Sequence, residues 1–141
     1  MIRFGQRLPD RAYRLRPGAY GMLLNAQSEI LVVEAATGAF YLPGGGLEAG
    51  ETAEQAVVRE FMEEAGLEVR CVREIGTVSQ IVHSLDETHG YEKICAFFEV
   101  DLASDGRRTP SAYRSRWLSH RDAEAALLED AHKWAVRRQA T

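Results

Sequence analysis

Three glutamates in the middle of the chain could carry chemistry because they share one face of a predicted helix. At about 100° per residue, the side chains of Glu60, Glu63 and Glu64 project within roughly 100° of one another. Like charges at this spacing destabilise an isolated helix by about a few tenths of a kcal/mol per pair. A hard divalent cation would offset that repulsion, and a ligand set made only of oxygen favours Mg²⁺ or Mn²⁺ over zinc. Taken alone, the pattern fits either a metal site for phosphate chemistry or a solvated acidic face.

The glycines before this helix favour the metal site. Gly44, Gly45 and Gly46 allow the backbone to approach a ligand closely, and their carbonyl oxygens could complete the shell of a metal ion. A P-loop would need GxxxxGK[ST], but no Lys-Ser or Lys-Thr follows these glycines. A Rossmann turn would need GxGxxG, a spacing that this segment lacks. Both of these alternative phosphate-binding motifs are therefore excluded.

A longer pattern connects the glycines to the glutamates. From Gly45 the chain runs through five residues to Glu51, and through seven more to the sequence REFMEEAGL at 59–67. At every defined position this order resembles the Nudix box, GX5EX7REUXEEXGU, in which U is a bulky apolar residue. The box covers about a sixth of the chain. The Leu-Pro entry at 42–43 and the strand and helix predicted after Trp117 also resemble a Nudix domain.

The resemblance implies an α/β/α sandwich with a mixed sheet and a catalytic loop-helix-loop. It also implies hydrolysis of a diphosphate that is linked to another moiety, with Mg²⁺ or Mn²⁺ bound by the box glutamates. Carried over by position, Glu63 and Glu64 would be the principal metal ligands. Glu60 would be a third ligand or a carboxylate that orients water, and the carbonyl of Gly45 would be a further ligand.

Two other residues of the box have an implied supporting role. Glu51 and Arg59 would form an ion pair that fixes the loop, and the loss of either should loosen the site. The mechanism would be metal-assisted, in-line attack of water at phosphorus, in which the ion neutralises phosphate oxygens and lowers the pKa of bound water.

The general base is the least defined part of this site. Members of the family often take an additional carboxylate from outside the box, and we prefer Glu92 for this catalytic role. The segment 111–116 contains no acidic residue and is excluded. The competing carboxylates are Asp86, Glu87 and Glu99.

Candidates for substrate contacts rest on charge and ring chemistry. Arg14, Arg16 and Lys93 are candidate phosphate-binding residues. A nucleobase could stack on an aromatic side chain or meet a histidine, although ordinary packing is the default expectation for such residues. These candidates are Tyr13, Tyr20, Tyr91, His83 and His89.

We therefore predict a pyrophosphohydrolase that cleaves a nucleoside diphosphate or triphosphate, including oxidised nucleotides. The alternatives are a hydrolase of nucleotide sugars, ADP-ribose or dinucleoside polyphosphates, and a non-catalytic module that senses a nucleotide. The chain has no proline between Pro43 and Pro110, which lowers the expectation for ADP-ribose. The intact box disfavours the sensing module.

The elements that position these residues give an α/β or α+β class with a mixed sheet. A helix is predicted between the capping box at Thr52 and the stop at Gly66, with a core-facing stripe at 53, 57, 61 and 65. Strands are predicted at 19–24, 30–34, 40–42, 68–79, 92–102 and 117–118, with 19–24 and 30–34 paired as a hairpin. A helical tail is predicted from Ser119 to Ala140, with a break near Asp130.

Length and composition are those of one globular domain over residues 1–141. The chain has 45% hydrophobic and 27% charged residues, which excludes a mainly disordered or fibrous protein. Its net charge of -4 argues against a nucleic-acid polymer as partner. Cys71 and Cys95 lack a metal or redox spacing, and we expect reduced thiols. We expect a cytoplasmic monomer or homodimer that makes no contact with a membrane.

Overall fold

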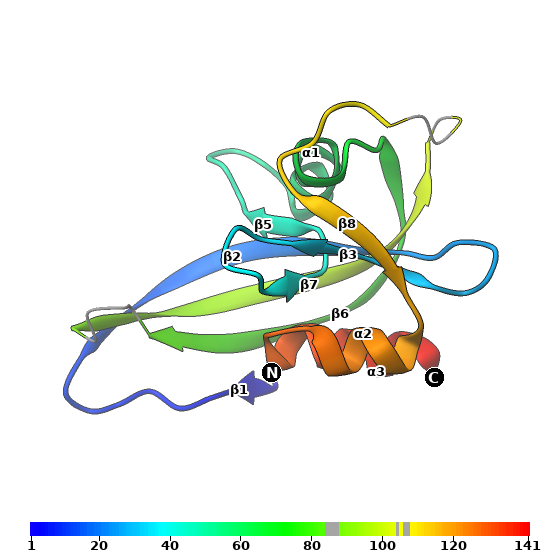
Figure 1. Ribbon diagram of the computed structural model, residues 1–141. Coiled ribbons are helices and arrows are strands. Elements are labelled where there is room, and N and C mark those ends of the chain that lie inside the picture. The colour runs from blue at the N-terminus through cyan, green and yellow to red at the C-terminus, as the bar shows by residue number, and fades with distance from the viewer. Residues whose placement is uncertain (84–87, 104, 106–107) are drawn as a thin grey trace.

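The structure, a computed structural model, describes residues 1–83, 88–103, 105 and 108–141. The described residues form a five-stranded sheet, a three-stranded sheet and three helices (Figure 1). In spatial order the larger sheet contains β1 (Arg3–Phe4), β6 (Val69–His83), β7 (His89–Leu102), β2 (Ala12–Leu23) and β5 (Gly44–Gly46). The smaller sheet contains β4 (Phe40–Tyr41), β3 (Ile30–Glu34) and β8 (Arg114–Leu118). The helices are α1 (Ala53–Ala65), α2 (His120–Ala126) and α3 (Asp130–Ala140).

The larger sheet is mixed, as predicted. Strand β2 runs parallel to β7 and β1 runs parallel to β6, whereas β6 with β7 and β2 with β5 are antiparallel. Helix α1 lies on one side of this sheet and helices α2 and α3 lie on the other (Figure 1). Each side has its own apolar core. The predicted α/β class with a mixed sheet is confirmed.

Helix α1 begins and ends where the sequence predicts. The Thr52 hydroxyl accepts from the backbone N–H of Gln55, and the Gln55 side chain accepts from the backbone N–H of Thr52. Gly66 ends the helix in the left-handed conformation, with φ of 68°. Of the predicted stripe, Val57, Phe61 and Ala65 are buried in the core.

The predicted pairing of 19–24 with 30–34 is wrong, apart from one isolated bridge between Leu24 and Ile30. Strand β3 pairs with β4 and β8 in the smaller sheet. Strand β2 pairs with β7 along one edge and, at residues 18–20, with β5 along the other. Gly44–Gly46, which we expected in a loop, form β5, a strand of the larger sheet.

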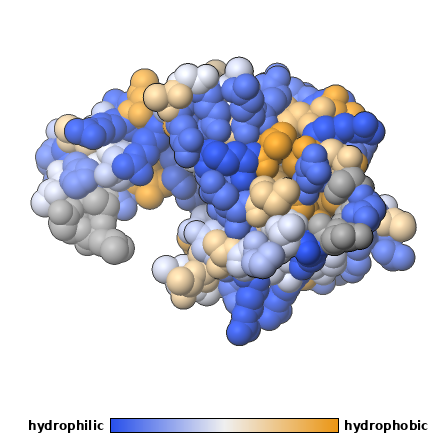
Figure 2. All heavy atoms as spheres, turned by 90° about the horizontal axis from the view of Figure 1, so that it is seen from above, coloured by the Kyte–Doolittle hydropathy of each residue, from blue (hydrophilic) through white to orange (hydrophobic). Residues whose placement is uncertain are grey.

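The remaining elements are close to the predicted ones. Strands β2, β6 and β7 are longer than predicted, and β1 was not predicted at all. The predicted break in the helical tail is confirmed, because α2 ends at Ala126 and α3 begins at Asp130. The face seen from above α1 is mostly hydrophilic (Figure 2). Among the described helices, none is both long and apolar enough to cross a membrane.

Close packing of α1 on β2 gives a test of the fold. A Cβ atom at Gly21 would lie 2.5 Å from Phe61 Cε2 and 3.0 Å from Val57 Cγ1. We expect Gly21→Ala to lower the free energy of unfolding by about 1–3 kcal/mol because α1 must move away from the sheet. Urea denaturation measures this change. The matched control is Gly46→Ala, whose added methyl group would meet nothing closer than 3.9 Å. Equal stability of the two variants would contradict the packing.

Candidate active site

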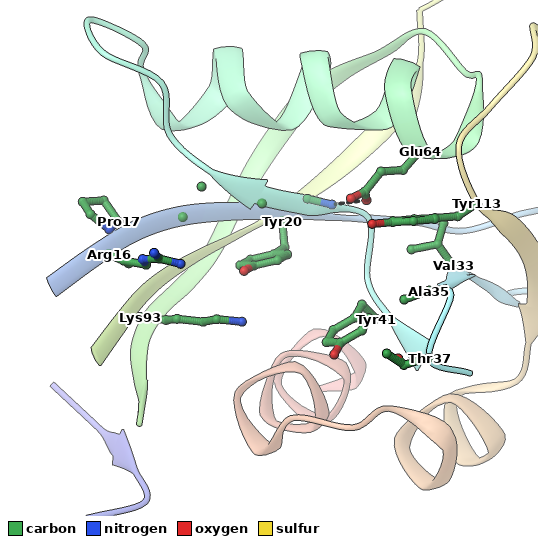
Figure 3. A pocket seen from close by; sticks show the side chains of 14 residues that line it. Arg16, Pro17, Tyr20, Val33, Ala35, Thr37, Tyr41, Glu64, Lys93 and Tyr113 are labelled. Carbon is green, nitrogen blue, oxygen red and sulfur yellow. Dashed lines mark hydrogen bonds between the residues drawn. The ribbon is translucent and has the colours of Figure 1, made fainter. Parts of the chain in front are cut away.

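A pocket of about 410 Å³ lies beside the box. Strands β2, β5 and β7, helix α1 and the smaller sheet all contribute to its lining (Figure 3). The glycine strand Gly44–Gly46 and Glu64 of α1 lie at one end. The lining therefore joins both sheets to the predicted catalytic helix.

Glycine is needed in β5 because neighbouring groups lie where a side chain would be. At Gly44, where φ is 155°, a Cβ atom would overlap the carbonyl oxygen of Ala19 and the Tyr20 ring. At Gly45 a Cβ atom would lie 2.8 Å from Glu60 Oε1. The backbone of β5 is thus brought directly against the carboxylates of α1.

Arg59 connects the loop, the glycine strand and the helix. Its Nε and Nη2 atoms donate to the two carboxylate oxygens of Glu51 at 2.8 and 3.0 Å, which is the ion pair implied by the box. The same guanidinium donates to Glu60 Oε1 at 2.9 Å and to the carbonyl oxygen of Gly46 at 3.1 Å. Glu63 lies 3.4 Å away from it and is half exposed.

The box carboxylates are crowded. Burial and the neighbouring charge of Glu60 raise the pKa of Glu64, against the effect of a 3.0 Å hydrogen bond that its Oε1 accepts from the backbone N–H of Gly44. Burial also raises the pKa of Glu60, although Arg59 opposes this effect. The carboxyl groups of Glu60 and Glu64 lie close enough for each to affect the pKa of the other. A proton or a cation between two acids this close would relieve their repulsion.

These observations test whether a divalent ion fits. Within the described residues, no three His, Cys, Asp or Glu side chains converge closely enough to form a ready metal cluster. Instead, Glu60 and Glu63 both accept from the same Nη1 atom of Arg59. The chemistry of the donors nevertheless suits a hard cation. Two carboxyl groups lie in contact beside a backbone cradle that a Cβ at Gly45 would fill.

Glu92 lies in a different environment. Arg3 Nε and Nη2 donate to its two oxygens at 3.1 Å each, and Arg7 Nε donates at 2.9 Å. Burial alone would raise its pKa, but hydrogen bonds from Ser79, Arg7 and Arg3 leave that pKa below the ordinary value. Glu92 does not line the pocket. These contacts favour a structural role for Glu92, and its predicted role as a general base is tested by the substitution described below.

Of the three competing carboxylates, only Glu99 lies within the described residues. Asp86 and Glu87 lie outside the described residues. Glu99 accepts from Arg73 and from Gln139 of α3, on the side of the sheet opposite α1. His83 and His89 lie near the far end of β6 and β7 and do not line the pocket.

The three candidate phosphate-binding residues do not all lie in the same pocket. Arg16 and Lys93 line the pocket, where their strands run side by side in register. Arg14 lies instead at a second hollow with Tyr13 and Tyr91. The guanidinium carbon of Arg16 lies 3.7 Å from the centre of the Tyr91 ring, which holds that side chain by a cation-π contact.

Several residues of the pocket were not predicted. Tyr41 of β4 and Tyr113, the residue before β8, line it. Glu129 and His132 are buried against lining residues, Glu129 on Lys93 and His132 on Tyr20. The tyrosines look like ordinary packing residues in the sequence. For Glu129 and His132, the signal in the sequence is their spacing of three residues at the start of a helix.

A family model described as a NUDIX domain matches residues 14–139. This chain belongs to the NUDIX family. It is similar to the 8-oxo-dGTP diphosphatase of Escherichia coli (strain K12), with 44% identity over 54 residues that cover 35% of this chain and 42% of that relative. The matched segments cover less than half of the length of each of the curated relatives.

Solved structures share the fold of this NUDIX domain. The MutT protein from Methanosarcina mazei Go1 has a TM-score of 0.69 and 20% identity, covering 89% of this chain and 93% of that chain. An ADP-ribose pyrophosphatase from Streptococcus suis 89-1591 has a TM-score of 0.64 and 20% identity, covering 89% and 90%. At this identity the likeness establishes the fold alone.

The ion pair of Glu51 gives a prediction about acid stability. The hydrogen bond from Arg59 lowers the pKa of Glu51 from 4.5 to about 2, and the backbone N–H of Glu48 contributes. A lowered folded-state pKa stabilises the fold above pH 4.5, and this contribution is lost as the pH falls toward 2. We expect Glu51→Gln to be less stable than the natural chain at pH 7, with a difference that shrinks between pH 4.5 and 2. Urea midpoints across this range measure it, and a difference that does not vary with pH would count against the ion pair.

The environment of Glu92 predicts a structural effect. Glu92→Gln removes a carboxylate that two half-exposed arginines hold, so we expect a loss of about 1–2 kcal/mol in unfolding free energy. Turnover per folded molecule should change little. Denaturation and steady-state kinetics on the same preparation measure both quantities. A 100-fold fall in kcat at unchanged stability would instead establish Glu92 as the base.

Proposed function

We propose that this NUDIX domain is a metal-dependent pyrophosphohydrolase that cleaves the phosphoanhydride bond of a nucleoside diphosphate or triphosphate. The observation that carries the proposal is the position of the box carboxylates. Glu60 and Glu64 meet beside the backbone of β5, where Gly45 leaves the space open, and Glu64 lines a pocket large enough for a nucleotide.

The ion would be Mg²⁺ or Mn²⁺, held by Glu60, Glu63, Glu64 and the carbonyl oxygen of Gly45. When bound, it would neutralise phosphate oxygens and lower the pKa of the attacking water. Arg59 would keep its paired hydrogen bonds to Glu51 and so hold the loop in place.

The remaining contacts of the chain position the substrate. The N–H of Gly44 holds one oxygen of Glu64, which orients this carboxylate between β5 and the pocket. Arg16 and Lys93 both line the pocket as substrate-binding residues, and Arg16 supplies positive charge for the anionic part of the substrate. Arg14 lies outside this pocket, and we assign it no contact.

Two features support nucleotides as the substrate class. The curated relative from Escherichia coli is named an 8-oxo-dGTP diphosphatase, which agrees with the prediction of oxidised nucleotides. The pocket also has an aromatic and apolar side formed by Tyr41, Val33, Ala35 and Tyr113, which suits a flat base. Nucleotide sugars, ADP-ribose and dinucleoside polyphosphates are the alternative substrates. A sensing module without catalysis is disfavoured by the complete set of box glutamates.

We further propose that the domain acts on its small-molecule substrate in the cytoplasm, as a monomer or homodimer. Cys71 and Cys95 are free thiols, which suits a reducing compartment.

Removal of one metal ligand tests the proposed function. We expect Glu63→Gln to lower turnover of nucleoside triphosphates by roughly 100-fold or more in Mg²⁺, because replacing even the partners of metal ligands costs 10- to 100-fold. Glu63 is half exposed, so the fold should survive. Pyrophosphate release measures turnover, with oxidised dGTP, ADP-ribose and nucleotide sugars as additional substrates. The matched control is Glu54→Gln, an exposed glutamate on the same helix. Equal turnover of the two variants would exclude the proposed metal site.

A further inference from the structure

A buried charged group lies behind the pocket wall, on the side opposite the box carboxylates. Lys93 Nζ of β7 donates to Glu129 Oε2 at 2.8 Å. Glu129 is the residue before α3, and only 9% of its surface is exposed. An acid buried to this extent is costly unless it is paired, and Lys93 supplies the opposite charge. Lys93 is therefore held firmly at one place in the pocket.

His132 supports Glu129 from within the core. It is fully buried, and its Nδ1 accepts the backbone N–H of Leu42 at 3.0 Å. Burial and the nearby charge of Lys93 lower the pKa of His132 to about 3, so the ring is neutral. Because Nδ1 is an acceptor, the proton of the neutral ring lies on Nε2. His132 Nε2 lies 3.6 Å from Glu129 Oε1, so the N–H points its positive end toward that oxygen.

Glu129 Oε1 and His132 Nε2 have no hydrogen-bond partner among the described residues. Buried polar atoms of this kind are rare in folded proteins and call for an explanation. Lys93 therefore holds Glu129 through one oxygen only. A role in holding Lys93 explains why such a group is retained beneath an apolar part of the pocket.

The ammonium of Lys93 faces the part of the pocket away from the phosphate end. In Figure 3 it extends toward Tyr41, on the side of α3, whereas Glu64 and β5 lie on the other side of Tyr20. An ammonium has three donor hydrogens and no acceptor. One hydrogen is used by Glu129, and the others are available to a ligand in the pocket.

We propose that Lys93, positioned by Glu129 and His132, recognises a carbonyl oxygen of the nucleobase, so that the site prefers guanine or 8-oxoguanine to adenine. This inference rests on the proposed function, in which the phosphates lie at the Glu64 end. Guanine carries a carbonyl oxygen at the edge where adenine carries an amino group. Lysine can donate to that oxygen but can offer nothing to the amino hydrogens. The aromatic side of the pocket binds the ring, and Lys93 selects the base.

The test compares kcat/KM for dGTP and dATP in Mg²⁺. In the natural chain we expect dGTP to be preferred by about tenfold or more, which is the usual size of discrimination by one well-placed polar contact. Lys93→Met should remove this preference, mainly by raising KM for dGTP. The matched control is Lys133→Met, which removes the lysine that donates to the carbonyl oxygen of Glu124 outside the pocket. It should keep the natural ratio.

The same assay separates base recognition from phosphate binding. If Lys93 contacts phosphate, Lys93→Met will lower kcat/KM for dGTP and dATP equally, and the ratio will not change. That result would overturn the inference.

Glu129→Gln tests the positioning role. It preserves the shape of the side chain but weakens its hold on Lys93, so the ratio of kcat/KM for dGTP to that for dATP should fall partway toward the ratio of Lys93→Met. Equal losses for both substrates would show that Glu129 is needed only for structure.

A binding measurement keeps the inference separate from the proposed function. Calorimetry with dGMP and dAMP gives the ratio of their affinities without any turnover. If no triphosphate is hydrolysed, the proposed function fails, but a dGMP preference that Lys93→Met removes would still support base recognition by Lys93. Equal affinities of the natural chain for dGMP and dAMP would overturn it.

Discussion

Arg59 is the group on which the arrangement of the box carboxylates depends. Four acidic side chains of the loop and helix lie within reach of its guanidinium, together with the carbonyl oxygen of Gly46. A planar, permanently charged group with several donors can serve these partners at once, whereas a lysine could not. Glu60 and Glu63 both accept from its Nη1 atom. Arg59 therefore holds the box carboxylates around one positive charge.

Strand β2 joins this arrangement to the rest of the molecule. Gly21 lets α1 pack closely on the sheet, Tyr20 separates the two ends of the pocket, and Arg16 lines its wall. Its pairing with β5 brings Ala19 beside Gly45 and so places the glycine backbone against Glu60. One strand thus sets the distance between the helix that carries the carboxylates and the residues that line the rest of the pocket.

The two ends of the pocket have different electrostatics. At the α1 end, carboxylates crowd together, and their raised pKa values reflect burial and mutual repulsion. At the α3 end, Lys93 is neutralised by Glu129, with a neutral His132 behind it. A buried ion pair contributes little net stability because both charges lose their hydration. Its presence is better explained by specificity than by folding.

The local chemistry of the site could be read from the sequence because it lies in one short segment. The capping box at Thr52, the stop at Gly66 and the spacing of the glutamates are local properties, and helix periodicity alone places the carboxylates on one face. The ion pair of Glu51 with Arg59 also lies within this segment.

The pocket could not be read in the same way because its residues come from distant parts of the chain. Whether β3 pairs with β2 depends on which strands occupy the edges of β2, and this is a property of the whole sheet. Glu92 and Lys93 are neighbours in sequence, yet strand alternation sends one to Arg3 and the other to Glu129. The sequence by itself determined the family, the catalytic helix and its carboxylates. Only the tertiary structure decided which cations face the pocket and what lies behind them, because long-range strand pairing and burial assign these partners.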